Sequence, residues 1–201
     1  MKKLITIAGG SASGKSTIAK NLEEFLNDSG VKTIVCSQDN YTICPLADIK
    51  PLVSISEYNF DNPYSIDTKH LFSDITKMIN GENVYMPEYY FGQKQKEYKK
   101  NFSGSPEVII LEGTFVLTYE YLNQIKYKSI FIDIDEKTRL ERRIKRDFIE
   151  RNIKEESVIE RFNKFVKNSH DNYIQPSIKN ADIIISNDYK IDEIIKILNI
   201  W

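Results

Sequence analysis

The chain has 201 residues, of which 41% are hydrophobic and 28% are charged, and its net charge is −1. These values are typical of one globular domain, and the near-neutral charge excludes bulk attraction to nucleic acid or anionic lipid. A small-molecule partner is therefore favoured over a polymeric one. No apolar run has the length of a membrane span and no leader precedes the first apolar run, so we expect a cytoplasmic protein.

A glycine-rich motif lies between the first two predicted elements. Residues 4–8 are an apolar run typical of a buried strand, and the residues after 17 have an apolar spacing typical of a helix. Between them the sequence satisfies G-x-x-x-x-G-K-[ST], whose backbone N–H groups bind phosphate. A glycine-rich turn that matches by chance is the alternative. The residues predicted to hold a nucleotide are Gly9, Gly10, Ser11, Ala12, Ser13, Gly14, Lys15, Ser16 and Thr17.

Two predicted strand ends carry acids that could act beside this loop. Asp39 follows the strand expected at residues 31–37, and it is either a general base or part of a turn that stops the strand. Glu112 ends the apolar run 108–111, where it is either a ligand of Mg²⁺ together with the Ser16 hydroxyl or only a charged strand end. Because ligands of open α/β sheets bind beyond the carboxyl ends of the strands, both acids are expected near the loop. The predicted cofactors are ATP or GTP and Mg²⁺.

Residues 42–66 contain three prolines and show no periodicity, so they form either a functional loop or an ordinary packed one. Asp67 is expected to cap a helix that ends at Gly81, and a strand-like run at 84–92 could form a hairpin over the site. His70 in that helix is expected to be a surface or satisfied histidine.

The second half of the chain continues the alternation of strands and helices. After a strand at 129–134, Asp135 should cap a helix whose apolar side carries Leu140, Ile144 and Phe148. Its other face is either a phosphate-binding cluster or an ordinary solvated surface, and it carries Arg139, Arg142, Arg143 and Arg146, with Arg151 beyond.

Ser157 and Glu160 predict a capping box for a long helix with Tyr173 in its core stripe, and residues 181–185 predict a fifth strand. The predicted fold is a three-layer P-loop NTPase fold, in which a five-stranded parallel sheet has helices on both faces.

Several motifs together resemble the uridine–cytidine kinase family of P-loop nucleoside kinases. They are the loop at 9–17, QDNY at 38–41, NFDNP at 59–63, ILEG at 110–113, and RRIKRD at 142–147 followed by Arg151. The resemblance extends to about residue 185. It implies one kinase domain over 1–201, with a substrate-binding insert at about 42–100, a lid at about 143–156 and a hairpin that covers the substrate.

The resemblance also implies an ATP-dependent phosphorylation of the 5′-hydroxyl of a nucleoside. The implied catalytic residues are Asp39 as base, Lys15, Arg143, Arg146 and Arg151. The implied substrate-binding residues are Asp39, Tyr41, Phe60, Asp61, Tyr89, Phe91, Lys94, Arg143 and Arg161. Relatives in this family often form homo-oligomers, although no interface is evident in this sequence.

The sequence departs from the family where a pyrimidine would be recognised. Lys94 and Lys96 stand where the family has His and Arg, and Arg161 stands where it has Gln. A lysine ammonium cannot accept a hydrogen bond and does not replace a bidentate arginine. The acceptor is therefore open, and a sugar phosphate or a pantothenate-like carboxylate is an alternative to a nucleoside. A catalytically idle nucleotide-binding regulator is a further alternative, whereas the lack of an N-K-x-D motif argues against a GTPase.

Overall fold

The computed structural model describes residues 2–43, 58–88, 97–100, 106–126, 128–186 and 191–199. Its centre is a five-stranded sheet with the order β2-β5-β1-β6-β7 and parallel pairing throughout. The strands are β1 (Lys3–Gly9), β2 (Thr33–Ser37), β5 (Val108–Glu112), β6 (Lys128–Ile132) and β7 (Ile183–Ile185). The predicted parallel sheet of five strands is confirmed, with several strands shorter than expected.

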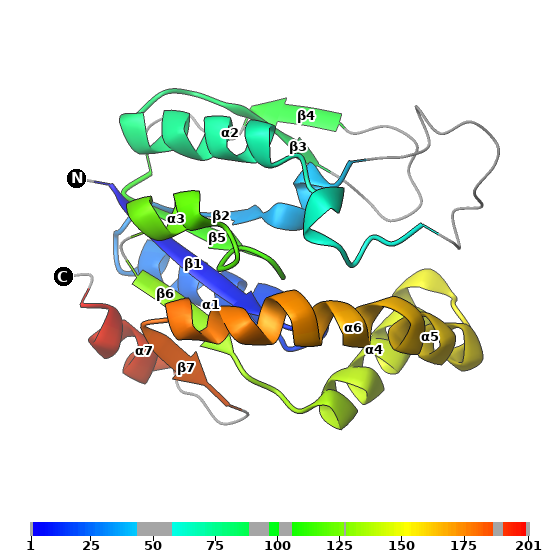
Figure 1. Cartoon of the computed structure of the whole chain (residues 1–201). Helices are drawn as coiled ribbons and strands as arrows, with labels where there is room; N and C mark the ends of the chain where they lie inside the picture. Colours follow the sequence, from blue (N-terminus) through cyan, green and yellow to red (C-terminus); the bar gives the residue numbers. More distant parts are fainter. Residues whose placement is uncertain are drawn as a thin grey trace.

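Helices cover both faces of this sheet (Figure 1). Side chains of β1 alternate between two apolar clusters, with Leu4 and Ala8 in one and Ile5 and Ile7 in the other. The first cluster includes residues of α2 (Thr68–Asn80) and α3 (Glu120–Ile125), and the second includes residues of α1 (Lys15–Asp28) and α7 (Ile191–Leu198). The three-layer architecture is therefore confirmed.

Local hydrogen bonds define the helix ends that the sequence indicated. The Asp67 carboxylate accepts from the backbone N–H of His70 at 3.0 Å, and α2 ends at Gly81 with a φ of 89°. Asp135 caps α4 (Glu136–Arg151) by accepting from the N–H of Thr138 at 2.9 Å. These three assignments are confirmed.

The predicted capping box is wrong. Helix α5 (Glu155–Arg161) begins directly after Lys154, so Ser157 lies inside its first turn. Glu155 and Glu156 occupy this turn, where carboxylates interact favourably with the helix dipole.

The helical run continues from α5 through η3 (Phe162–Val166), α6 (Lys167–Ser169), η4 (His170–Ile174) and η5 (Gln175–Asn180). Segments η3 and η4 have π-helical turns, which rotate the following side chains relative to an α-helix. As a result Ile174 enters the core with 2% exposure, whereas Tyr173, which was expected there, is 38% exposed.

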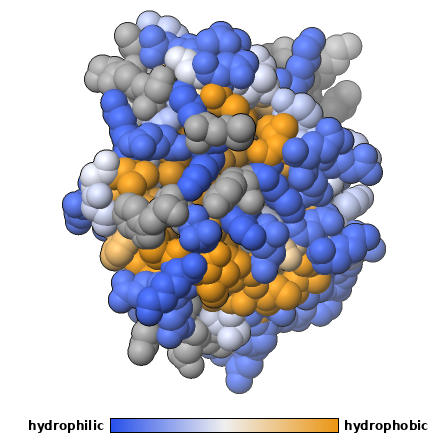
Figure 2. Space-filling model, turned by 90° about the vertical axis from the view of Figure 1, so that its left-hand side faces the viewer, coloured by the Kyte–Doolittle hydropathy of each residue, from blue (hydrophilic) through white to orange (hydrophobic). Residues whose placement is uncertain are grey.

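Strands β3 (Tyr85–Glu88) and β4 (Glu97–Lys100) pair in antiparallel fashion as a separate two-stranded sheet. The predicted hairpin is thus present, but Tyr89, Phe91 and Lys94 lie outside the described residues. On the side of the molecule that carries the amino ends of the central strands, hydrophobic residues are visible between hydrophilic ones (Figure 2). Within the described part of the chain, no helix combines the length and apolar character needed to cross a bilayer.

Candidate active site

The loop between β1 and α1 has the backbone of a phosphate-binding loop. Gly9 and Gly14 have φ values of 149° and 101°, which favour glycine over other residues. A Cβ atom on Gly9 would lie 2.6 Å from the carbonyl oxygen of Ile132, and one on Gly10 would lie 2.7 Å from Arg139 Nη1. The glycines therefore let the loop pack tightly against β6 and α4. Helix α1 begins at Lys15, directly after Gly14.

Polar groups of the loop are arranged as an anion would require. The Lys15 ammonium is buried and donates to the carbonyl oxygen of Gly10 at 3.0 Å. Burial lowers the pKa of Lys15, whereas the negative charges of Glu112 and Asp39 act in the opposite direction. The buried Ser13 hydroxyl has no hydrogen-bond partner in the described structure. A loop with positive-φ glycines, an ammonium and an unsatisfied hydroxyl fits a bound phosphate.

Glu112 ends β5 beside the loop, where its side chain is 6% exposed. Burial and then the charge of Asp39 raise the pKa of Glu112, whereas the charge of Lys15 and the hydroxyls of Ser37 and Ser16 lower it. Carboxylate and hydroxyl oxygens are the ligands that Mg²⁺ prefers. In the described residues no group of three or more His, Cys, Asp or Glu side chains forms a metal cage, so an ion here would take its other ligands from water and phosphate.

Asp39 lies in the short turn η1 (Gln38–Tyr41), directly after β2, and it is exposed. The carboxylate is near enough to affect the pKa of Lys15, Glu112 and Arg151. The structure therefore brings Asp39, Lys15 and Glu112 to the same edge of the sheet, as the motif spacing indicated.

The turn η1 is held by the buried side chains on either side of Asp39. Gln38 accepts from the backbone N–H of Phe115 at 3.0 Å and donates to the Tyr119 hydroxyl at 3.3 Å. Tyr41 donates from its hydroxyl to Asp74 at 3.0 Å. These bonds fix the backbone of the turn on both sides of Asp39 and thereby the place of its carboxylate.

Tyr41 was expected to bind substrate, but the structure places it in the core with 0% exposure. Its hydroxyl is occupied because α2 presents Asp74, which also lies 3.2 Å from Nε2 of His70. His70 packs edge-on against the Tyr41 ring at 5.3 Å. Tyr41 is thus a buried support of the turn and not a ligand-facing residue, and His70 is a satisfied histidine as predicted.

We predict that Gly113→Ala disturbs this turn. A Cβ atom at position 113 would lie 2.3 Å from Cβ of Gln38 and 2.5 Å from its Oε1. Overpacking of this kind costs about 1–3 kcal/mol, so the free energy of unfolding should fall by that amount. Turnover per folded molecule should also fall, because Gln38 precedes Asp39. Chemical denaturation and a coupled ADP-release assay measure the two effects.

Gly30→Ala is the matched control, because Gly30 has a φ of 84° and no atom lies within 4 Å of the position that a Cβ atom would take there. It should lower stability by about 1 kcal/mol through backbone strain and leave turnover unchanged. Wild-type turnover in Gly113→Ala would show that the Gln38 contact does not position Asp39.

The most buried side of helix α4 is not the apolar side that was expected. Its buried residues are Arg139, Arg143 and Asp147, whereas Leu140 and Ile144 are half-buried and Phe148 is 63% exposed. The neighbouring loop offers polar groups and not an apolar surface, which explains the difference. Arg139 Nε donates to the Ile134 carbonyl oxygen at 2.9 Å, and Arg143 Nη1 donates to the Ser11 hydroxyl at 2.9 Å.

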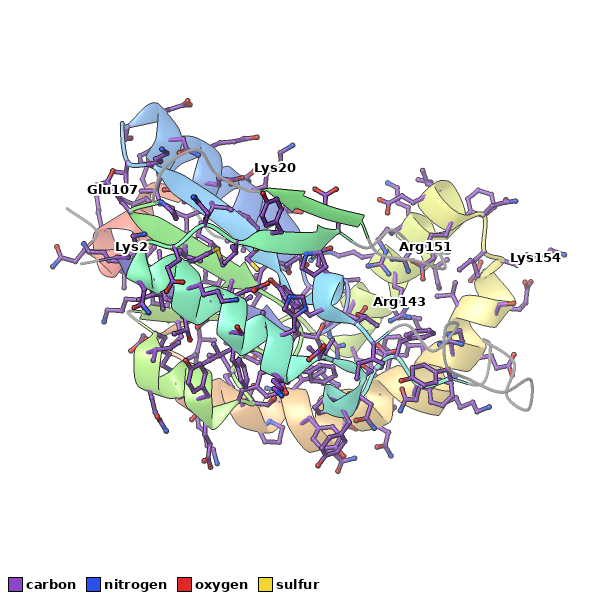
Figure 3. The ribbon with its side chains drawn as sticks, turned by 90° about the horizontal axis from the view of Figure 1, so that it is seen from above. Lys2, Lys20, Glu107, Arg143, Arg151 and Lys154 are labelled. Carbon is purple, nitrogen blue, oxygen red and sulfur yellow. The ribbon has the colours of Figure 1, made fainter. Side chains whose placement is uncertain are left out.

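One acidic residue that the sequence analysis did not single out connects three of these arginines. Oδ1 of Asp147 lies 2.8 Å from Arg146 Nη2 and 3.2 Å from Arg151 Nη1, and Oδ2 lies 3.5 Å from Arg143 Nε. Arg143 and Arg151 are each four positions away on the same helix, and that spacing is the signal that could have identified Asp147. Arg143 and Arg151 lie at the opposite end of the molecule from Lys2 and Glu107, which precede β1 and β5 (Figure 3).

The segment expected to bind the acceptor lies against this arginine cluster. Asp61 Oδ1 is 3.7 Å from Arg143 Nη1, and the Phe60 ring packs edge-on against Tyr58 at 4.7 Å. Arg161 Nη2 donates to the Tyr58 carbonyl oxygen at 3.2 Å. The structure thus brings Phe60, Asp61, Arg143 and Arg161 together.

A parallel sheet of this order, with a phosphate-binding loop after its first strand and a buried acid at the end of the neighbouring strand, defines a P-loop kinase fold. The chain belongs to the phosphoribulokinase/uridine kinase family, whose model matches residues 4–191.

Relatives and solved structures agree with this assignment. The chain is 39% identical over 197 residues to uridine kinase-like protein 5 of Arabidopsis thaliana, covering 96% of this chain and 42% of that protein. It is 34% identical over 182 residues to a uridine kinase of Deinococcus deserti, covering 90% of this chain and 86% of that protein. The chain thus spans about two fifths of the length of the plant relative.

Two solved structures share the fold. One is a kinase from Silicibacter sp. TM1040 that is named for a fructose transport system, with a TM-score of 0.74, 17% identity and coverage of 92% of this chain and 89% of that one. The other is phosphoribulokinase from Rhodobacter spheroides, with a TM-score of 0.67, 14% identity and coverage of 92% and 70%.

Proposed function

We propose that this protein transfers the γ-phosphoryl group of ATP to a primary hydroxyl group of a small molecule, with the 5′-hydroxyl of a nucleoside as the favoured acceptor. The observation that carries the proposal is the meeting of Asp39, Lys15 and Glu112 at one edge of the sheet, where β1, β2 and β5 end side by side. The names of the Arabidopsis and Deinococcus relatives support a nucleoside acceptor. In this proposal residues 1–201 act as one kinase domain with an acceptor-binding insert at about 42–100 and a lid at about 143–156.

Each side chain then has a role in phosphoryl transfer. Asp39 accepts the proton of the acceptor hydroxyl as that oxygen attacks, and the loop from Gly9 to Thr17 holds the phosphates. Lys15 balances the charge of the β- and γ-phosphates. Bound Mg²⁺ would supply neutralising charge for the phosphate oxygens, and Ser16 and Glu112 are the residues that would hold it, Glu112 directly or through a water.

The arginine cluster and the acceptor segment complete the site. Arg143, Arg146 and Arg151 stabilise the charge spread over the transferred group, and closure of the lid excludes water. Asp61 binds the vicinal hydroxyls of the acceptor and Phe60 contributes an apolar wall. Tyr89, Phe91 and Lys94 are proposed to contact the acceptor from the hairpin side.

A second acceptor class is favoured by one observation. The Arg161 guanidinium lies beside the segment that carries Asp61, where it bonds to the carbonyl oxygen of Tyr58. A cation at this place suits an anionic acceptor, such as a sugar phosphate or a pantothenate-like carboxylate, better than it suits an uncharged base.

An acceptor panel tests both proposals. The protein is incubated with ATP or GTP, Mg²⁺ and one acceptor at a time from uridine, cytidine, adenosine, guanosine, ribulose 5-phosphate and pantothenate. Coupled ADP or GDP release and the mass of the product are measured. We expect transfer to uridine or cytidine. Transfer only to an anionic acceptor would select the second class, and tight nucleotide binding without any acceptor-dependent turnover would show an idle regulator.

A further inference from the structure

The Asp147 side chain is the most enclosed acidic group of the arginine cluster. It is 3% exposed, whereas the side chains of Arg146 and Arg151 are 30% and 27% exposed. Asp147 makes no contribution to a hydrophobic cluster, and its carboxylate interacts with three guanidinium groups. A buried carboxylate is costly unless it is paired, so this arrangement calls for an explanation.

The geometry divides the two carboxylate oxygens among the three arginines. Oδ1 accepts from Arg146 at 2.9 Å through Nε and lies 2.8 Å from Nη2, which is a two-point contact. The same oxygen lies 3.2 Å from Arg151, while Oδ2 lies 3.5 Å from Arg143. Three like charges so close together repel one another, and a single central carboxylate both offsets that repulsion and sets their relative positions.

The three arginines around Asp147, which we call the arginine array, reach different parts of the site. Arg143 donates to the Ser11 hydroxyl of the phosphate-binding loop and lies 3.7 Å from Asp61 of the acceptor segment. Arg151 is near enough to Asp39 for that carboxylate to affect its pKa. A movement of the array would therefore change its contacts with the loop and the acceptor segment and its distance from the proposed base.

We infer that Asp147 is a positioning residue that holds Arg143, Arg146 and Arg151 as one array toward the phosphate-binding loop and lowers the array's net positive charge. This inference rests on the proposed function, because the array acts on the transferred phosphoryl group. Asp147 does not touch the substrate itself. Its charge also limits how tightly the array holds a nucleotide, so that product can leave.

The inference predicts opposite effects of Asp147→Asn on binding and on turnover. The array gains one unit of net positive charge, so the affinity for ADP should rise by about threefold or more. The neutral amide loses the charge attraction to the three guanidinium groups and offers one acceptor oxygen in place of two, so the array loses its geometry and kcat should fall by about tenfold or more. Calorimetric titration with ADP and steady-state kinetics with the best acceptor of the panel measure the two effects.

Glu141→Gln is the matched control, because it removes one carboxylate from an exposed position of the same helix. It should change neither quantity by more than about twofold, as expected for a screened surface charge. If Asp147 had only a structural role, Asp147→Asn would lower the melting temperature, and the ADP affinity and the kcat per folded molecule would equal those of the wild type.

Asp147→Glu separates the charge from the geometry and serves as the second variant if Asp147→Asn does not fold. It should keep ADP affinity within about twofold and lower kcat by about tenfold, because the carboxylate is displaced by one methylene group. Unchanged or weaker ADP binding in Asp147→Asn, or wild-type kcat in Asp147→Glu, would overturn the inference. If the wild-type protein transfers no phosphoryl group, the proposed function fails, and the ADP titrations still test the charge effect of Asp147.

Discussion

Asp39→Asn is expected to lower kcat by about 10²- to 10⁴-fold while nucleotide binding is retained. The amide has nearly the same shape as the carboxylate but cannot accept the proton of an acceptor hydroxyl. Because Asp39 is exposed and its turn is held by Gln38 and Tyr41, the fold should not change. Removal of its negative charge should leave ADP affinity equal to or slightly above that of the wild type. Steady-state kinetics and calorimetry with ADP measure these effects.

Asp28→Asn is the control, since this exposed acid at the end of α1 undergoes the same change of charge far from the loop. Its kinetics should match those of the wild type. Equal turnover of the Asp39→Asn variant and the wild type would disprove the role of Asp39 as base and with it the proposed mechanism.

Lys15→Met is expected to reduce kcat/KM by about 10³-fold, because it deletes the buried cation that we propose balances the developing phosphate charge. Its effect on stability should be small or even favourable. Lys15 is a buried charge whose pKa is lowered by burial, so its removal relieves a desolvation cost while one hydrogen bond to Gly10 is lost. We expect the free energy of unfolding to stay within about 1 kcal/mol of the wild type.

Lys20→Met on the same helix provides the comparison, because the side chain of Lys20 is 72% exposed and pairs only at the surface with Glu24. It should bind ADP and turn over as the wild type does. If Lys15→Met retained nucleotide affinity and turnover, the loop would not be the phosphate site, whatever acceptor the panel identifies.

The sheet, its helices and the loop could be predicted because each depends on residues close together in the chain. Apolar runs that end in a glycine or an acid identified the strands, and a cap such as Asp67 bonds to an N–H three residues away. The phosphate-binding motif lies within nine consecutive residues, so no distant partner is needed to recognise it. The position of Asp39 also followed, since carboxyl ends of parallel strands share one edge of the sheet.

Other features depended on what the folded chain presents to each side chain. The apolar stripe predicted for α4 is not its most buried side, because the phosphate-binding loop and the segment after β6 offer oxygens that bind Arg143 and Arg139. Tyr41 became a core residue because α2, which is distant in sequence, places Asp74 at its hydroxyl.

Amino-acid order alone therefore predicted the class of fold, the position of the loop and the strand ends that carry Asp39 and Glu112, since these arise from short-range spacing. Which face of a helix is buried, and which carboxylate pairs with which cation, is set by the partner surface. That surface exists only after segments far apart in the chain have packed, and Asp147 among its three arginines is the clearest case.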